Sequence, residues 1–491
     1  MISRLNDCKI EIKNVKFTAD SGVTYPKTAI VSFNRPDKTG KTVDLYGYIE
    51  QDDIFKLIEE KKAICLDHCL IDKFSLSDYR TFHGLPKKEY VNIQGFSAKN
   101  AFFSSNLKID FSFASFASGH ISFDNSFFAK GDLSFNSAHF AEGGLSFTYT
   151  IFNCDVVDFA NTVFGSGDVS FKNAIFTKGT KDFQYADFGK GDVTFINTEF
   201  NDGDISFINA LFGDGELSFK VARIGNGKKD FHYAKFGNGE ISFERTEFGN
   251  GRVDFRKIEF GNCRVTFNRA VFGNGAITFE GSELKSGKFN FKKVISGEGG
   301  IDFSIAEFEN AEIYFDDAYF GHGSMNFYNS KFQKISLKSC HLDHYIDLRL
   351  AHTEYLDLSN TIVRDILDMK PYDFPVDIKV INFEGMRLIG RIYIDWNSNN
   401  VRKSIENQVE SSLRSKGDQF RTLKQNFNVT GQYTNEDDAY VYFKRYEALA
   451  ELHEAVDNKK VSTVWKYPKY IFTWIVFDKI GLYAKIGRAH V

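Results

Sequence analysis

The stretch Phe236–Phe255 reads FGNGEISFERTEFGNGRVDF, in which one phrase occurs almost twice at a spacing of twelve residues. Stepping by twelve along Phe111–Phe327 gives nineteen positions, and all of them are Phe. A second series, Phe116–Phe332, is Phe at sixteen of nineteen positions; the exceptions are Ile224, Leu284 and Ser296. Similarity at a fixed period over such a length indicates a repeat architecture.

Each repeat reads [ILV]-x-F-x-x-[AST]-x-F-G-x-G-x, and both halves alternate with a period of two. Alternation of this kind points successive side chains to opposite sides of an extended backbone. Gly-x-Gly, as at Gly237 and Gly239, is expected to form a turn that accepts a positive φ. No 3.6-residue apolar stripe occurs here, which excludes helical repeats. Short extended pieces joined by tight turns predict a mainly-β protein, a β-solenoid.

Two repeats are the smallest closed coil that these side chains allow, which gives about 24 residues per coil. Twelve extended residues would enclose a perimeter of only about 40 Å at about 3.3 Å per residue, which is too small for two Phe rings and a branched aliphatic. The outward residue just before a Phe of the first series is Asp at six positions, all separated by an even number of repeats: Asp110, Asp158, Asp182, Asp230, Asp254 and Asp302. This spacing independently favours a coil of two repeats.

The phenylalanines are expected to form internal ladders, with rings stacked from coil to coil. Burying each ring contributes about 1.5 to 3 kcal/mol. An aromatic strip for sugar binding would instead need its rings on the outside. The predicted core ladder comprises Phe111, Phe123, Phe135, Phe147, Phe171, Phe195, Phe219, Phe243, Phe267, Phe116, Phe140, Phe164, Phe188, Phe212 and Phe236.

Outward aspartates form the candidate interaction surface: Asp158, Asp182, Asp230 and Asp254. The first two and the last two are each one coil apart, so each pair would lie on adjacent layers about 5 Å apart. Like charges at that distance repel unless a cation or a basic side chain intervenes. Two interpretations stay open, a surface for a cation or a basic partner and an ordinary solvated face interleaved with Ser134, Ser206 and Thr278.

Bulk composition argues against several kinds of site and partner. A net charge of −4 on 491 residues gives no reason to expect nucleic acid. The six Cys are irregularly spaced and the N-terminus lacks the apolar run of a signal peptide, which predicts a cytoplasmic protein. Cys65 and Cys69 flank His68 without a second ligand pair at zinc-like spacing, so no metal is expected. The Gly-x-Gly loops lack a phosphate-binding context and no nucleophile elbow occurs, so no cofactor and no catalytic residue is expected.

A small residue two places before Phe, as in Ala270–Phe272, resembles the pentapeptide-repeat superfamily. That resemblance implies a right-handed quadrilateral β-helix with Leu or Phe at its centre. This chain departs from the strict five-residue period by alternating steps of five and seven, with Gly loops in the longer step. The resemblance concerns residues 101–333, roughly half of the chain, and is specific for architecture rather than for activity.

The flanks of the repeat region have other patterns. Residues 1–100 contain strand-like KIEIKNVKF and VDLYGYIE and the helical spacing of Asp52–Lys62, which together predict a small α/β cap on the open end of the stack. Residues 334–397 keep the small-x-apolar step, with Leu348, Leu358 and Asp368 ten apart, and predict narrower coils. Residues 401–458 place aromatic anchors on helical spacing and predict a helical hairpin.

The C-terminal segment is where the sequence suggests a membrane. Lysines precede the apolar run Tyr470–Phe477, so residues 459–485 are expected to be a juxtamembrane segment at the inner face of the membrane. Residues 486–491 read IGRAHV, whose codons can spell the start of a widely used sequencing adapter. We expect this hexapeptide to be an artefact and the natural C-terminus, with any membrane segment, to be missing.

Phe420–Arg445 followed by FDKIGLYA resembles bacterial pentapeptide-repeat proteins that continue into a two-helix, potassium-channel-like pore. The sequence therefore favours a non-enzymatic scaffold or interaction protein, membrane-associated in its complete form. The alternatives are the cytoplasmic regulatory domain of a truncated ion channel and a DNA-mimicking topoisomerase-binding protein. Residues 109–332 contain 30 acidic and 21 basic residues, a net charge of −9 that is mild for a mimic of duplex DNA. A polysaccharide-acting enzyme would need a carboxylate and Lys/Arg cluster at one site, which the repeats lack.

Overall fold

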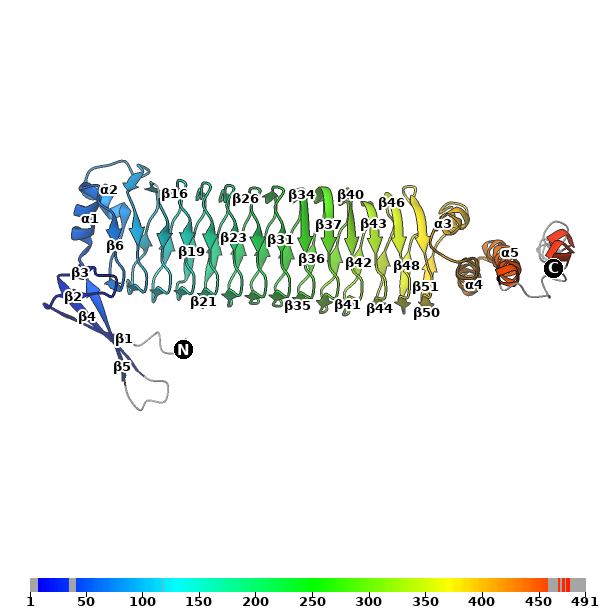
Figure 1. Cartoon of the computed structure of the whole chain (residues 1–491), viewed down its shortest axis with the longest axis horizontal. Helices are drawn as coiled ribbons and strands as arrows, with labels where there is room; N and C mark the ends of the chain where they lie inside the picture. Colours follow the sequence, from blue (N-terminus) through cyan, green and yellow to red (C-terminus); the bar gives the residue numbers. More distant parts are fainter. Residues whose placement is uncertain are drawn as a thin grey trace. The chain divides into compact units, whose positions relative to one another are not determined.

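The computed structural model describes residues 8–34, 41–117, 119–457, 467–468, 470–472 and 474–476. They belong to two compact units, Met1–Lys288 and Phe289–Val491, and each unit contains coils of parallel β-solenoid (Figure 1). The predicted mainly-β solenoid is confirmed. Within the Phe repeats of the first unit, paired residues on neighbouring coils are two repeats apart, as in Leu133 and Val157, which confirms the predicted coil length.

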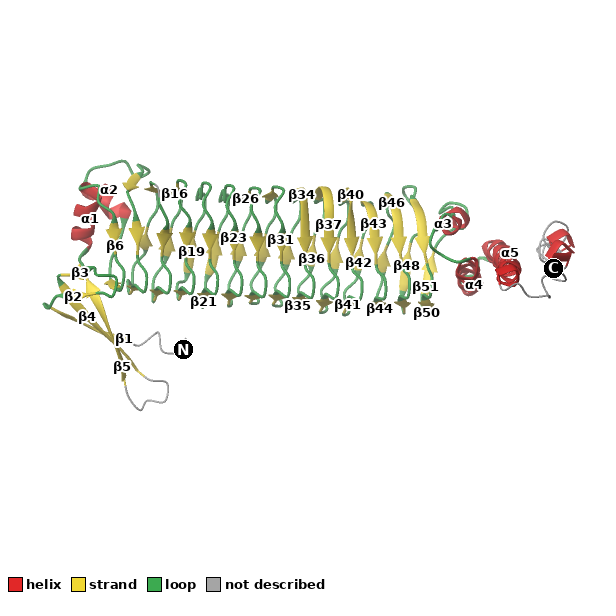
Figure 2. Ribbon diagram, in the orientation of Figure 1, coloured by secondary structure: helices red, strands yellow, loops and turns green. Residues whose placement is uncertain are grey.

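Each coil of the first unit has four sides, and each side adds a short strand to one of four parallel ladders (Figure 2). The first ladder contains β6 (Ile64–Cys65), β9 (Phe96–Ser97), β13 (Ile121–Ser122), β17 (Leu145–Ser146), β20 (Val169–Ser170), β23 (Val193–Thr194), β27 (Leu217–Ser218), β31 (Ile241–Ser242) and β34 (Glu259–Thr266). The second contains β7 (Cys69–Ile71), β10 (Phe102–Phe103), β14 (Phe127–Phe128), β18 (Ile151–Phe152), β21 (Ile175–Phe176), β24 (Glu199–Phe200), β28 (Arg223–Ile224), β32 (Glu247–Phe248) and β35 (Val271–Phe272).

The third ladder contains β11 (Ile109–Asp110), β15 (Leu133–Ser134), β19 (Val156–Asp158), β22 (Thr180–Asp182), β25 (Ile205–Ser206), β29 (Lys229–Asp230), β33 (Val253–Asp254) and β36 (Ile277–Thr278). The fourth contains β8 (Val91–Ile93), β12 (Ala114–Phe116), β16 (His139–Phe140), β26 (Leu211–Phe212), β30 (Lys235–Phe236) and the start of β34, with single bridges at Val163 and Asp187. Ladder strands begin at Ile64, inside the range 1–100 that the sequence assigned to the cap.

A left-handed residue turns the chain once in every repeat. It lies two places after each Phe of the first series, and all nineteen such positions, from Phe113 to Asn329, have positive φ. The following residue closes a four-residue turn, as where the N–H of Ala114 donates to the carbonyl of Phe111 at 3.1 Å. Asn tolerates this conformation better than other side chains, which explains why Asn occupies many of these sites.

The Gly-x-Gly loops match the prediction only in part, because Gly165 and Gly189 have a positive φ, of 63° and 61°, whereas other loop glycines do not. Gly237 and Gly239 do not have the positive φ that the sequence was expected to require. They are needed for close stacking, because a Cβ on Gly239 would lie 1.9 Å from the carbonyl oxygen of Gly215 in the preceding coil. The loop between these glycines is held by its Asn, since the N–H of Asn238 donates to Asp214 Oδ1 at 2.9 Å.

Phenylalanine rings fill the coils of the first unit. All fifteen residues of the predicted core ladder lie inside and are at most 6% exposed. Rings on successive coils stack face to face, as in Phe111 and Phe135, whose centroids are 4.7 Å apart at 3°. Rings from opposite sides meet edge to face, as in Phe111 and Phe123 at 83°. Both arrangements are favourable for aromatic quadrupoles, so the ring contacts stabilise the interior.

An α/β cap precedes the coils, as predicted. Antiparallel strands β1 (Cys8–Lys13), β4 (Lys27–Asn34) and β5 (Lys41–Tyr48) are accompanied by β2 (Phe17–Thr18), β3 (Thr24–Tyr25), α1 (Gln51–Glu59) and α2 (Leu76–Phe82). Strand β5 pairs in parallel with β7, so the cap sheet continues directly into one ladder. Its inner face, with Val31 and Tyr48, packs on Leu70 and Phe102.

The second unit continues with strands of the same kind. They are β38 (Ile295–Ser296), β39 (Ile301–Asp302), β40 (Glu307–Tyr314), β41 (Tyr319–Phe320), β42 (Met325–Asn326), β43 (Lys331–Ser336), β44 (His341–Leu342), β45 (Ile346–Asp347), β46 (His352–Asp357), β47 (Ile362–Val363), β48 (Ile366–Asp368), β49 (Ile378–Asn382), β50 (Arg387–Leu388) and β51 (Arg391–Tyr393), and β37 (Glu283–Asn290) contains the boundary in sequence. Coil length varies here, because Met325 pairs with Ile346 at a shorter step than Leu367 with Ile392. The expected spacing of ten fails at Asp368, because Met369 is the inward residue.

Helices close the second unit, which confirms the predicted C-terminal hairpin: α3 (Val401–Glu406), α4 (Leu413–Val429) and α5 (Tyr433–Asp457). Side-chain amides of this region replace a missing strand. Asn426 both accepts from the N–H of Ile392 and donates to its carbonyl, each at 2.9 Å, and Gln419 accepts from the N–H of Phe383 at 2.9 Å. These bonds cover strand edges that would otherwise be free to pair with another chain.

Candidate interaction surface

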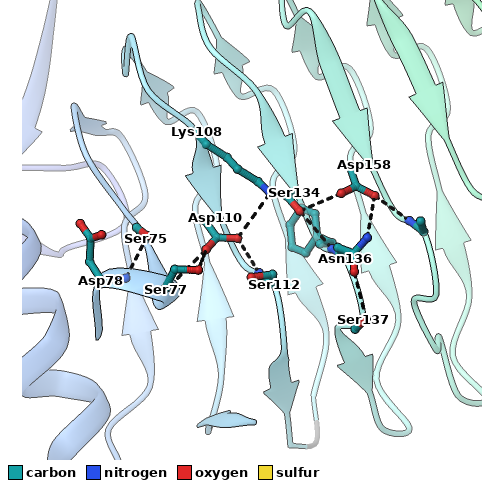
Figure 3. A network of polar contacts seen from close by, with 12 residues as sticks. Ser75, Ser77, Asp78, Lys108, Asp110, Ser112, Ser134, Asn136, Ser137 and Asp158 are labelled. Atoms are coloured by element: carbon teal, nitrogen blue, oxygen red, sulfur yellow. Dashed lines mark hydrogen bonds and ion pairs between the residues drawn. The ribbon is translucent and has the colours of Figure 1, made fainter. Parts of the chain in front are cut away.

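The predicted aspartates lie on one outward column of the third ladder. Asp158 pairs with Asp182, and Asp230 with Asp254, so both predicted pairs are on adjacent coils. Ser206 lies between the two pairs. Figure 3 shows the start of this column, where Asp110, Ser134 and Asp158 follow one another on successive strands.

Each of these carboxylates has a local structural role. The side chain accepts a hydrogen bond from the backbone N–H two residues later, in the turn that follows the Phe. Asp158 Oδ1 accepts from Ala160 at 2.9 Å, and Asp182 Oδ1 accepts from Gln184 at 2.9 Å. Because a turn N–H without a partner would be costly, this bond explains why the position favours a polar residue. It does not explain why the residue is charged.

The carboxylates of this column differ in whether a basic side chain neutralises their charge. Arg256 binds Asp254 with two hydrogen bonds, at 2.9 and 2.8 Å, and Arg252 lies 3.4 Å away. Burial tends to raise the pKa of Asp254, but hydrogen bonds and the charges of these two arginines outweigh it, so the pKa is lowered. Asp230 is paired with Lys228. These two predicted residues are therefore neutralised within the fold.

Asp158 and Asp182 are not neutralised in this way. The other donors to Asp158 are Ser134 Oγ at 3.1 Å and Asn136 Nδ2 at 3.3 Å, both uncharged (Figure 3). The donor to Asp182 is Gln184. Within the part of the chain that the structure describes, neither carboxylate forms an ion pair. Burial, and then the charge of Asp158, raise the pKa of Asp182.

The coils around Asp158 and Asp182 also contain more acidic than basic residues. Residues 109–219 contain 15 acidic and 5 basic residues, a net charge of −10, and one of the five, Lys181, is buried. Residues 220–288 contain 8 acidic and 13 basic residues, a net charge of +5. The first unit thus has an acidic stretch of coils followed by a basic one. The net charge of the whole chain, −4, does not reveal this division, because the opposite charges of the two stretches partly cancel.

Lys181 and Lys229 occupy inward positions where the other repeats have Ile, Leu, Val, Phe or Met. Both are at most 1% exposed. Lys181 Nζ donates to the carbonyls of Asn201 and Asp202 at 3.4 and 3.2 Å, whereas Lys229 Nζ has no hydrogen-bond partner among the described residues. Burial lowers the pKa of each amine to about 8. The sequence showed both departures but gave no sign of how completely they are enclosed.

A polar groove in the second unit was not predicted. It has a volume of about 550 Å³ and lies between β43, β46 and β49 and the loop after α3; its lining includes Lys334, Lys338, Tyr355, Asp357, Asn382, Glu384, Gln408 and Glu410. Much of its polarity is already satisfied internally. Lys334 Nζ lies 5.1 Å from the ring centre of Tyr355, and Asn382 Nδ2 is 3.4 Å from Asp357 Oδ1. The sequence could not show it because residues 407–411 reach the strands only through the tertiary fold.

Cysteine, histidine and acidic side chains are the groups that could bind a metal ion or act in thiol chemistry. Burial raises the pKa of the Cys65 and Cys69 thiols, which disfavours the thiolate that a metal requires. Over the described ranges, no group of three or more His, Cys, Asp or Glu side chains is arranged to hold a metal ion. His352 lies 2.8 Å from Asp377 and 3.1 Å from Glu354, so its ring contacts two carboxylates.

No family model, curated protein or solved structure matches this chain. The fold itself defines a repeat protein of the β-solenoid class. None of the helices among the described residues is long and apolar enough to cross a membrane. The predicted juxtamembrane segment, residues 459–485, and the hexapeptide 486–491 lie outside the described residues, except for a few positions between 467 and 476.

Proposed function

We propose that the protein is a non-enzymatic scaffold whose acidic coils, residues 109–219, bind a partner with a basic polypeptide surface. The observation that carries this proposal is the charge of −10 on these coils. A complementary field of this size accelerates encounter and selects partners by charge. The surface that presents the charge is held in a fixed geometry by the stacked rings beneath it.

A scaffold role is supported by the way the repeats use their polar groups. Ser134 and Asp158 of the outward column bind turn N–H groups, and the Asn loops bind neighbouring coils. The interior is filled by Phe, and its two lysines are enclosed. The repeated surface therefore offers binding area rather than a single concave centre for chemistry.

The pentapeptide-repeat resemblance stays part of this proposal. Four sides per coil and small residues two places before Phe support it. Membrane association at the inner face, and the alternative of a channel's regulatory domain, depend on residues 459–485 and stay predictions. The topoisomerase alternative is disfavoured by the basic charge of residues 220–288, which would repel a DNA-binding protein surface of positive charge.

A defined probe tests the proposal directly. We expect a fluorescent lysine-rich peptide to bind the full chain, with an affinity that falls as salt is raised. Asp168→Asn with Asp192→Asn should weaken it at least threefold, because both are exposed in the acidic coils and Asn retains their hydrogen-bond acceptors. The matched control is Glu244→Gln with Glu280→Gln, in the basic coils. Equal weakening by both pairs, or tighter binding of an acidic peptide, would refute the proposal.

A further inference from the structure

The polar groove of the second unit is lined by charged side chains of both signs that have no partner of opposite charge. Two are basic and three are acidic: Lys334, Lys338, Asp357, Glu384 and Glu410. Among the residues that the structure describes, none of the five forms an ion pair. Other charges of this unit do pair, as Lys331 with Glu307 at 3.2 Å and Lys379 with Asp377 at 2.9 Å. The groove therefore keeps charges of both signs available to a ligand.

The basic end of the groove consists of two ammonium groups. Lys334 Nζ lies 5.4 Å from the ring centre of Tyr314 and 5.1 Å from that of Tyr355. These contacts hold the ammonium in place, but they leave its charge. The carboxylate of Glu312, which is in register with Lys334, accepts a hydrogen bond from the hydroxyl of Tyr314 at 2.7 Å. Lys338 is exposed and has no hydrogen-bond or ion-pair partner over the described ranges.

Opposite charges occupy the two ends of one column, with a small residue between them. The register of β43, β46 and β49 continues past the ends of these strands, since the N–H of Ser339 donates to the carbonyl of Ser359 at 2.9 Å. Likewise, the N–H of Asn360 donates to the carbonyl of Glu384 at 2.8 Å. Lys338, Ser359 and Glu384 therefore stack on successive coils. Because coils are about 4.8 Å apart, the backbones at the two charged ends are about 10 Å apart.

The loop after α3 forms a fixed wall at the acidic end of the groove. Gln408 is buried in this loop and exchanges two hydrogen bonds with Gln419 of α4, at 2.7 and 2.9 Å. Ser411 Oγ donates to Glu384 Oε2 at 3.2 Å, so the loop also contacts the acidic end of the column. A groove whose walls are already held in place loses little conformational freedom when a ligand binds.

We propose that this groove binds a short peptide with free termini, its carboxylate at Lys338 and its amino group at Glu384. A purely anionic ligand would leave the carboxylates of the lining unpaired, and a purely cationic one would leave the lysines unpaired. An extended chain spans about 3.3 to 3.6 Å per residue, so about three residues connect the two ends. The side-chain amides of Asn360 and Asn407 are in the lining and exposed, and they can bind the peptide groups between the termini.

The test is a ligand-observed NMR titration of the full chain with triglycine, up to about 10 mM so that a weak site is detected. Two blocked peptides are compared with it: N-acetyl-triglycine, which lacks the amino group, and triglycine amide, which lacks the carboxylate. We expect each blocked peptide, and glycine alone, to bind about fivefold more weakly than triglycine, because each loses one charged contact.

Two protein variants assign the ends of the peptide. Lys338→Gln should weaken triglycine binding about fivefold and abolish the preference for triglycine over its amide. Glu384→Gln should do the same for the preference over N-acetyl-triglycine, and Gln retains the acceptor for Ser411. Both positions are exposed, and an unchanged thermal midpoint shows that the variants fold. Lys331→Gln is the matched control on the same strand, since Lys331 is paired with Glu307, and it should leave binding unchanged.

Three results would overturn the proposal: no binding of triglycine, equal binding of triglycine and both blocked peptides, or preferences that persist in Lys338→Gln and Glu384→Gln. The site is separate from the acidic coils, residues 109–219, and triglycine has no basic side chain. Asp168→Asn with Asp192→Asn should therefore leave triglycine binding unchanged, so either proposal can fail without the other.

Discussion

Lys181 and Lys229 lie on the same inward column of the first unit, two coils apart, with Ile205 between them in register. Both amines are enclosed, and the other residues of this column are apolar. They differ in one respect: Lys181 donates to two loop carbonyls, and Lys229 has no partner among the described residues. An enclosed amine without a partner is a cost to the fold.

Replacing the unpartnered amine should therefore stabilise the protein. We expect Lys229→Met to raise the free energy of unfolding by about 1 to 4 kcal/mol, or the thermal midpoint by about 2 °C for each kcal/mol. Differential scanning calorimetry of the full chain measures this change. Lys181→Met is the control and should gain less, because it also removes two hydrogen bonds. A lower midpoint for Lys229→Met would contradict the assignment.

The same lysines predict a pH dependence. Their pKa values are lowered to about 8 in the fold, against about 10.4 for an exposed lysine. Between these values the unfolded chain holds more protons than the folded one, so stability rises as pH increases from 8 to 10. The gain is up to roughly 3 kcal/mol per lysine.

Other buried groups titrate in this range, so the comparison must be made between variants. The midpoint of the unchanged protein minus that of the double variant Lys181→Met with Lys229→Met should rise from pH 8 to pH 10. A difference that stays constant across this interval would show that the amines are charged in the fold.

We expect Gly239 to be required because a side chain there would collide with the neighbouring coil, and not because the turn needs a positive φ. Gly239→Ala should lower the thermal midpoint by several degrees, because its Cβ would lie 1.9 Å from a backbone oxygen that cannot move away. Gly239→Asn should be no better, although Asn tolerates a positive φ. Gly95→Ala is the control, since its Cβ would meet its nearest neighbour, Ala63 Cβ, at 3.4 Å. If Gly239→Asn were more stable than Gly239→Ala, the glycine would be required for a positive φ instead.

Val221 is poorly suited to its place in the repeat. It has a φ of 61° and is 46% exposed. Its left-handed backbone conformation is therefore strained, and burial of the side chain does not offset that strain. Val221→Asn should raise the free energy of unfolding by about 1 kcal/mol. The reverse substitution at the equivalent turn one repeat earlier, Asn209→Val, should lower it by a similar amount. If both changes were neutral in chemical denaturation, conformational strain would not explain the preference for Asn.

Asn426 should protect the end of the second unit from self-association. Asn426→Ala leaves the N–H and the carbonyl of Ile392 without their partner, at a cost of about 1 to 3 kcal/mol per buried group. The exposed edge can then pair with another chain. Light scattering should show a molar mass that rises with concentration. Thr422→Ala, a change at a half-buried position on the same helix, should leave the mass unchanged.

Much of the fold could be predicted because its determinants are local and repeated. The two-residue alternation sets which side chains face inward, and the Asp spacing indicated that two repeats close one coil; Phe111 and Phe135 stack as that register requires. Where the repeat changes, prediction failed: Asp368 was placed in step with Leu348, but coils of unequal length make Met369 the inward residue.

Of the candidate surface, the sequence by itself determined the alignment of the aspartates, since residues two repeats apart must share a face of the coil. Only the tertiary structure decided which carboxylates are compensated, because Lys228, Arg252 and Arg256 act through distances that no repeat count supplies. It also decided that Gly239 is needed for contact with the coil beneath it and that Lys229 is sealed inside. Periodicity is a property of the sequence itself, whereas burial and charge pairing depend on which residues of the neighbouring coils lie in contact.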